Sequence, residues 1–156
     1  LAGGADTNGI PTITLATAGT GNLVLGAIVS GAGALSYGSA YGVPQDSPIV
    51  IPAVKSRNYY VLVADDPNTI FEIQEDSVGG AIAVTDIALN HNLASGTNNG
   101  YVSGWMLDSS GAATTATLQM KILQLAPRQD NAVGTYAKWW TIINNHAYRI
   151  GQAGKA

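Results

Sequence analysis

Short runs of β-branched and aromatic residues, each closed by residues that favour turns, set the pattern of this chain. Two of these runs are NYYVLVA at 58–64 and TIFEIQED at 69–76. The link between them, Asp-Asp-Pro-Asn, favours a turn because Asp and Asn bond to their own backbone and Pro presets φ. The two runs are therefore predicted to pair as a hairpin. Their shortness favours an all-β fold over alternating helices and strands.

The second run also indicates which of its faces is buried. In an extended chain Phe71 and Ile73 lie on one side, whereas Glu72 and Gln74 lie on the other. This two-residue period is typical of a strand that packs one face against a core.

Further strands are expected along the rest of the chain. PIVIPAV at 48–54 contains two prolines and fits an edge strand, because Pro cannot donate to a sheet. Asn-Gly at 99–100 is a hairpin turn signal and leads into a strand at 101–107. The last two strands are expected within 113–126 and 137–148.

Two irregularities are predicted as well. Within 113–126 the alternation of apolar and polar residues slips at 122–123, which indicates a β-bulge or a strand buried on both faces. A short helix is predicted across Ile87 to Asn90, with Thr85 or Asp86 as its cap. The expected fold is all-β, a small β-barrel or a jelly-roll-like β-sandwich with at most one short helix.

The first part of the chain has a different composition. Residues 1–46 are rich in Gly, Ala, Ser and Thr, and their charged residues are Asp6 and Asp46. Because Gly loses much backbone entropy in regular structure, this region is predicted to be an extended N-terminal arm, with a strand pair at 12–17 and 23–30. Residues 47–156 are predicted to form the barrel or sandwich domain.

The composition argues against several classes of function. The chain has no Cys and two His, and charged residues make up 11% of it, against about 25% in an ordinary soluble domain. A net charge of -3 lacks the basic excess of a nucleic-acid-binding protein. The longest apolar stretch, at 22–35, is interrupted by Gly and is shorter than the roughly 20 residues of a membrane span. We therefore expect no nucleic acid, membrane or cofactor as a partner.

An acidic cluster is the first candidate for chemistry. It consists of Asp65, Asp66, Glu72, Glu75 and Asp76. A hard-cation site would need oxygen ligands at set spacings around a Gly bend, whereas these acids flank a turn and alternate with apolar residues. A turn followed by a solvated strand face is the favoured interpretation, and no catalysis is predicted.

Other motifs that could carry chemistry are weaker. His91 and His146 are interpreted as hydrogen-bonding residues at the surface or at strand ends, and no nucleophile-elbow pattern surrounds a serine. Gly-Ala-Gly at 31–33 is similar to a dinucleotide-binding loop, but Ser36 stands where the third Gly is needed and no helix pattern follows. The chain is therefore not predicted to be an enzyme.

The tryptophans allow two interpretations. Trp105, Trp139 and Trp140 could form stacking platforms for sugars or bases, or could belong to a core or an interface. Adjacent residues of a strand point to opposite faces, so one of Trp139 and Trp140 is expected in the core and the other at the surface or an interface.

Charge is distributed unevenly along the chain. Every charged residue between 58 and 120 is acidic, whereas residues 121–156 hold one acid, Asp130, and the basic residues Lys121, Arg128, Lys138, Arg149 and Lys155. Either neighbouring strands of one subunit pair these charges, or an acidic face of one copy meets a basic face of another. Such complementarity between subunits fixes register and choice of partner.

Several segments taken in order resemble a family of tailed-phage head decoration proteins, also called cement proteins. The resemblance covers 58–148, and the segments that carry it are NYYVLVADDPNTIFEIQED at 58–76, TDIALNHN at 85–92, SGWMLD at 103–108, LQMKILQLAPRQDNAVG at 118–134 and AKWWTIINNHAY at 137–148. The resemblance implies an all-β subunit without enzymatic activity, commonly a trimer, that clamps neighbouring capsomers on the outer surface of the virion.

The expected partners are therefore further copies of this chain, as a homotrimer, and the phage major capsid protein, with no small-molecule substrate. An alternative is a receptor- or glycan-binding module of a tail fibre or cell surface, and a hydrolase with a hidden site is a third hypothesis. The candidate contacts with other copies or with the capsid are Leu1, Ile10, Pro11, Ile13, Asp65, Asp66, Lys121, Arg128, Lys138, Trp139 and Arg149.

Overall fold

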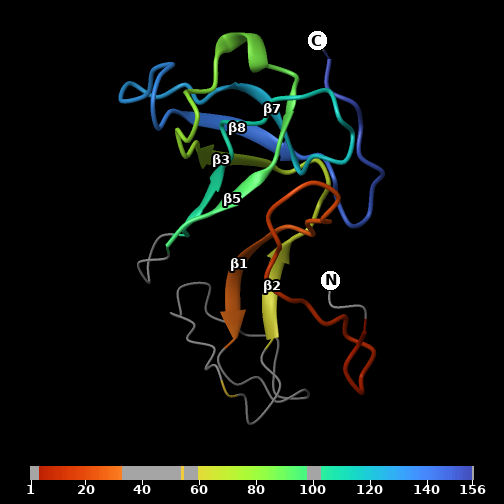
Figure 1. The fold of residues 1–156 in the computed structure, drawn as a ribbon. Helices are drawn as coiled ribbons and strands as arrows, with labels where there is room; N and C mark the ends of the chain where they lie inside the picture. The colour runs from red at the N-terminus through yellow and green to blue at the C-terminus, as the bar shows by residue number, and fades with distance from the viewer. Residues whose placement is uncertain (1–3, 33–53, 55–59, 98–102, 156) are drawn as a thin grey trace. The chain divides into compact units, whose positions relative to one another are not determined.

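The computed structural model describes residues 4–32, 54, 60–97 and 103–155. Apart from one turn of 3-10 helix, their regular structure is β throughout, which confirms the predicted all-β class (Figure 1). Within this part of the chain no helix is long and apolar enough to cross a membrane. In chain order the elements are β1 (Ala27–Ala32), β2 (Tyr60–Ala64), β3 (Ile70–Gln74), η1 (Val84–Asp86), β4 (Asn90–His91), β5 (Leu93–Ser95), β6 (Trp105–Leu107), β7 (Met120–Leu125) and β8 (Lys138–Ile143).

The chain divides into two compact units, which we call the main unit and the ribbon unit. The main unit comprises residues 1–25 and 67–156, and the ribbon unit comprises residues 26–66. The boundary predicted at residue 46 lies outside the described residues. The same holds for the edge strand predicted at 48–54, except for Val54.

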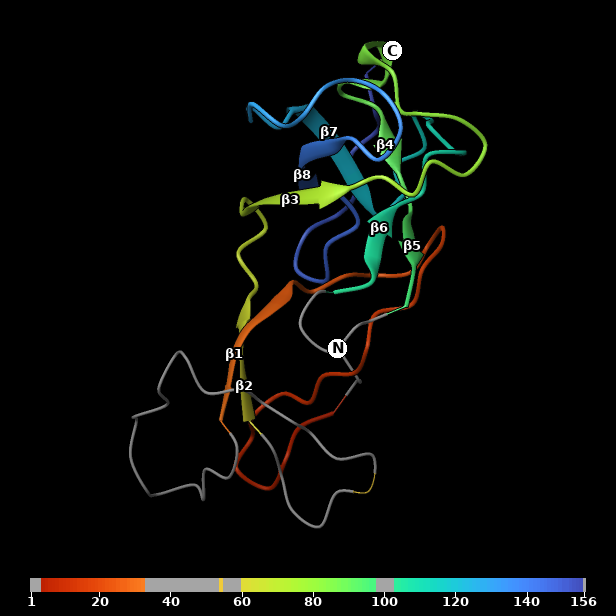
Figure 2. The same cartoon turned by 90° about the vertical axis from the view of Figure 1, so that its left-hand side faces the viewer.

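The main unit contains a four-stranded antiparallel sheet in the order β3-β8-β7-β4 (Figures 1 and 2). Along β8 every second residue is buried, namely Trp139, Thr141 and Ile143. The residues between them are half-buried, so the sheet has an inner face and an outer face. The last strand predicted from the sequence is thus confirmed, over fewer residues than expected.

A single apolar cluster lies on the inner face of this sheet. Leu93 and Leu107, from the antiparallel pair β5–β6, contact it, and Val24 and Ile82 join it from loops. Phe71 and Ile73 also pack against this cluster, as their alternation predicted. Among the described residues the strands belong to three separate sheets and do not close into a barrel. From the sheet the cluster includes Met120, Ile122, Trp139 and Ile143.

The irregularity predicted at 122–123 is confirmed as a bulge in β7. The register between β7 and β8 shifts between Ile122 and Gln124, which leaves Leu123 as the extra residue. Ile122 is fully buried, and Leu125, three residues later, also packs against the core. Without the bulge, residues three apart on a strand would face opposite sides.

The predicted short helix is displaced towards the N-terminus. A 3-10 turn covers Val84–Asp86, and Asn90 already belongs to β4. The carboxylate of Asp86 accepts a hydrogen bond from the Ala83 N–H at 2.9 Å, so it closes this turn instead of capping a helix that follows it. The predicted turn at 99–100 lies outside the described residues, and the strands on either side of it pair antiparallel.

The predicted hairpin between 58–64 and 69–76 is wrong in its pairing. Both runs contain strands, but β2 pairs with β1 and β3 pairs with β8. The link between the runs ends the ribbon unit at Asp66 and begins the main unit at Pro67. Pairing with β8 places the apolar face of β3 on the core. Burial of this face outweighs the preference of the 65–68 link for a chain reversal.

The ribbon unit contains the two-stranded antiparallel sheet β1–β2. At the start of β1 the close approach of the two strands requires Gly26, because a Cβ there would collide with the carbonyl of Ala64. The strand pair predicted between 12–17 and 23–30 is wrong, because 12–17 forms no strand and β1 takes β2 as its partner.

Candidate functional site

Ile10, Pro11 and Ile13, three of the candidate contacts predicted in the N-terminal arm, lie at the end of a small turn or just after it. Pro11 is exposed, Ile10 and Ile13 are half-buried, and Leu1 lies outside the described residues. The carboxylate of Asp6 accepts hydrogen bonds from the N–H groups of Asn8 and Ile10, each at 2.9 Å. A local Asx-type turn therefore shapes this segment.

Arg128 and Lys138 belong to a group of charges that is paired within the chain. Arg128 contacts Glu72 and Asp130 at 2.9 and 3.0 Å, and Lys138 lies 3.6 Å from Asp130. The hydrogen bond from Arg128 lowers the pKa of Asp130 to about 2. For the Arg128–Glu72 pair, the explanation by pairing within one subunit is confirmed. Exposed pairs of this kind contribute little to stability.

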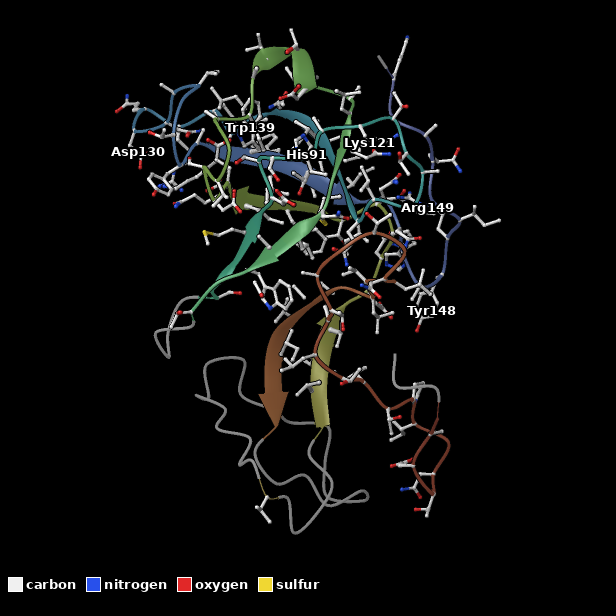
Figure 3. All side chains as sticks on the ribbon, in the orientation of Figure 1. His91, Lys121, Asp130, Trp139, Tyr148 and Arg149 are labelled. Atoms are coloured by element: carbon white, nitrogen blue, oxygen red, sulfur yellow. The ribbon has the colours of Figure 1, made fainter. Side chains whose placement is uncertain are left out.

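Lys121 and Arg149 differ from that group. The Lys121 ammonium donates to the carbonyl of Ala153 at 2.9 Å, and Arg149 donates to the carbonyl of Ile143 at 2.8 Å. Neither cation forms an ion pair with a carboxylate in the described part of the chain. Figure 3 shows both on one side of the main unit, with Asp130 on the opposite side.

An open pocket of about 480 Å³ adjoins Arg149. Its lining comes from Leu23, from the loop before β7 and from the segment that follows β8. Leu23, Tyr148 and Ile150 are large apolar side chains at this pocket, and each is more than half exposed. The pocket is therefore mostly apolar, with a guanidinium at one side.

Asp65 and Asp66, the acidic candidates, lie directly after β2 and are exposed. No group of three or more metal-ligating side chains occurs among the described residues. The acidic cluster predicted from the sequence is divided between the two units.

Trp139, a candidate contact, is a core residue, which corrects that prediction. It has no exposed surface, whereas Trp140 is half-buried on the outer face of the sheet. On that face Trp140 lies opposite Glu72 of β3 and Gln124 of β7. The predicted division of the two tryptophans between core and surface is confirmed, and the stacking platform suggested for Trp139 is excluded.

The two histidines are buried, which corrects the part of the prediction that placed them at the surface. His91 Nδ1 lies 2.9 Å from the carbonyl oxygen of Asp108, so this nitrogen carries the proton and donates it. His146 Nδ1 accepts a hydrogen bond from the Tyr148 N–H at 3.0 Å. The Nδ1 atoms of the two rings therefore have opposite hydrogen-bonding roles, and both rings hold loops in place.

Glu75 and Asp76, predicted as part of a solvated face, instead fasten loops. Glu75 is fully buried, and its carboxylate accepts hydrogen bonds from the Ile82 N–H at 2.6 Å and the Ser77 hydroxyl at 3.2 Å. Asp76 Oδ1 accepts from the Val78 N–H, the Ser109 N–H and the Ser109 hydroxyl. These carboxylates join the end of β3 to the loops at 77–82 and 108–110.

Asp76 gives the folded protein a predicted dependence on pH. Burial alone would raise the pKa of Asp76, but hydrogen bonds from Val78 and Ser109 hold it below its usual value of 3.8. A carboxyl with a lowered pKa stabilises the fold above its unfolded pKa, and this stability is lost as the pH falls through the folded value. Asp76→Asn is expected to cost about 1 kcal/mol at neutral pH, because the amide oxygen of Asn accepts these hydrogen bonds more weakly than a carboxylate does.

The measurement for Asp76 is urea denaturation of wild type and Asp76→Asn from neutral pH down to below pH 4. The stability difference is expected to shrink on acidification, because wild type also loses the charge. A difference that stays constant with pH would contradict this assignment.

Buried amide side chains are the residues that sequence reasoning missed. Gln119, with no exposed surface, accepts from the N–H groups of Gly19 and Leu93, each at 3.0 Å. It donates to the carbonyls of Thr17 at 2.8 Å and Asn22 at 3.2 Å. All four hydrogen-bonding positions of this amide are filled, and they fix the N-terminal segment to the start of β7.

Asn144 and Asn90 are buried amides that hold the C-terminal segment in place by hydrogen bonds. Asn144 donates to the carbonyls of Ala116 and Leu118 and accepts from the Gln152 N–H at 3.0 Å. Asn90 donates to the carbonyl of Gln152 at 2.8 Å. The buried polar groups of the main unit thus attach irregular segments to the sheet.

No protein family, curated protein or solved structure matches this chain. The resemblance to decoration proteins therefore stays a prediction. The function has to be inferred from the surfaces described above.

Proposed function

We propose that this protein is a structural virion protein that binds the outer surface of a phage capsid and stabilises contacts between capsomers of the major capsid protein. The observation that supports this most is the β1–β2 ribbon. Ile28, Val29 and Leu62 are each at least half exposed on a sheet of two strands. Neither strand contains a charged residue.

A two-stranded sheet is marginally stable in water and needs a further layer. Sheet edges in soluble proteins are usually protected by Lys, Pro or bulges. Here β1 has a bulge near Val29, whereas β2 has neither a charge nor a Pro. The ribbon therefore fits a segment that becomes covered when it lies on another protein, through its aliphatic side chains or by adding a strand to a partner's sheet.

Apolar exposure in other parts of the chain supports the same role. Leu15, Val54 and Ile150 are each at least 80% exposed. With charged residues at 11% of the chain, few ions must be desolvated on contact. Copies joined as a homotrimer would bind the lattice with raised effective concentration, so that weak single contacts give stable attachment.

The direct test compares capsids with and without this protein during heating. Because a ligand that binds only the closed shell stabilises it by mass action, complete shells are expected to release DNA at a higher temperature than shells lacking the protein. Equal release temperatures would exclude a bracing role.

A variant test addresses the ribbon. Ile28→Asp is expected to weaken co-sedimentation with empty shells about 10- to 100-fold, because burying one aliphatic side chain is worth about 1.5–3 kcal/mol. Val84→Asp is the matched control, since Val84 is also more than half exposed but lies on η1 of the main unit. Equal loss of binding in both variants would remove the ribbon from the interface.

A further inference from the structure

Lys121 and Arg149 carry two positive charges at one end of the main sheet. Lys121 lies opposite Ile142 in the β7–β8 register, and the guanidinium of Arg149 is bonded to the carbonyl of the next residue, Ile143. Both residues therefore lie near the same end of β8. Each donates to neutral oxygens, and neither pairs with a carboxylate in the described residues.

The electrostatics of the two groups agree with this geometry. Burial and the nearby charge of Arg149 lower the pKa of Lys121. A like charge close by disfavours the protonated form of an amine. At the other end of the sheet, Arg128 is neutralised by Glu72 and Asp130. The positive potential is thus concentrated on the side of the main unit labelled Lys121 and Arg149 in Figure 3.

The pocket beside Arg149 gives this charge an accessible, largely apolar setting. Its lining contains Arg149 and no Asp or Glu. The exposed side chains of Leu23, Tyr148 and Ile150 surround it with apolar surface. An ion pair formed against apolar surface is screened less by water than one in open solvent.

We propose that this cationic pocket binds the carboxylate of Asp65 from a second copy of the chain. Asp65 is exposed after β2 and forms no ion pair with the described residues. The chain supplies an acid in its ribbon unit and cations in its main unit, so the same contact can repeat from copy to copy. The charges are complementary, and the planar guanidinium of Arg149 suits a carboxylate.

The contact joins two different patches and is therefore heterologous. Contacts of this kind form closed rings when the rotation between subunits allows it. The charge pair sets register and partner choice, while the apolar rim supplies burial. This inference stands apart from the capsid-binding role, because it concerns the purified protein without shells.

The test is the mass of the purified full chain, measured by light scattering across a concentration series and at low and high salt. Wild type is expected to associate, more weakly at high salt. Asp65→Lys is expected to weaken association about 10-fold or more, because it places a second cation beside Arg149 at the pocket. Adding Arg149→Glu to Asp65→Lys is expected to restore association, since the proposed ion pair is then reversed.

The control is Thr85→Lys, which adds a lysine to an exposed position on η1 and should leave association unchanged. Circular dichroism checks that each variant is folded. A wild type that stays monomeric, or an Asp65→Lys variant that associates normally, would overturn the inference. If wild type is monomeric and Asp65→Lys lowers the melting temperature, Asp65 makes its contact within one chain, which also overturns the inference. If the contact between copies is wrong but the proposed function is right, complete shells still release DNA at a higher temperature than shells lacking the protein.

Discussion

Gln119→Ala is expected to lower the free energy of unfolding by about 4 kcal/mol, at about 1 kcal/mol for each of its four hydrogen bonds. The variant leaves the buried N–H of Leu93 without its acceptor and removes the hydrogen bonds that join the segment at 17–22 to Gln119. Urea denaturation measures the loss. Hydrogen exchange at the Gly19 and Leu93 amides reports its location and is expected to be faster in the variant.

Gln124→Ala is the matched control for this experiment. Gln124 is the same residue type on β7 but is exposed. A surface substitution of this kind is expected to change stability by less than about 0.5 kcal/mol. If the two variants lost the same stability, the segment at 17–22 would not depend on the buried amide.

The sequence predicts the strands of this fold well where an apolar period is present. Phe71 and Ile73 alternate with polar residues, and the structure places both against the core. The slip at 122–123 predicts the bulge in β7. In each case the signal is local, because the pleat alone decides which side chains share a face.

The pairing of the strands could not be predicted in the same way. The Asp-Asp-Pro-Asn link at 65–68 carries a strong turn signal, yet β2 and β3 have different partners. The partner of β3 is β8, which lies about half the chain away. Such pairing depends on which surfaces the whole chain can bury together, and no turn residue reports that.

The candidate site was predictable in part. The charge distribution identified Lys121 and Arg149, but it could not separate them from Arg128, which the fold neutralises with Glu72. The buried amide Gln119 could not be found, because its alternation with Leu118 and Met120 assigns it to the polar face of the predicted strand. Its role exists only once the N-terminal segment has docked on β7.

Trp139→Ala is expected to lower the free energy of unfolding by about 3–5 kcal/mol, the usual cost of removing a large aromatic side chain from a core. Trp139 has no exposed surface and belongs to the cluster that joins β7, β8 and the β5–β6 pair. Its Nε1 has no hydrogen-bond partner among the described residues. Trp139→Phe is therefore expected to cost much less, because it keeps most of the volume and removes an unpaired buried N–H.

Trp140→Ala is the matched control, because it alters the neighbouring residue of the same strand. Trp140 lies on the outer face and is half-buried, so we expect a loss of about 1 kcal/mol. Urea denaturation of the three variants gives the comparison. If Trp139→Ala were as stable as wild type but lost association or capsid binding, Trp139 would be an interface residue and the inner face of β8 would not be the core. Loss of stability in Trp139→Ala, with recovery in Trp139→Phe, assigns this side chain to packing. It then leaves Trp140 as the tryptophan of β8 that is available to a partner.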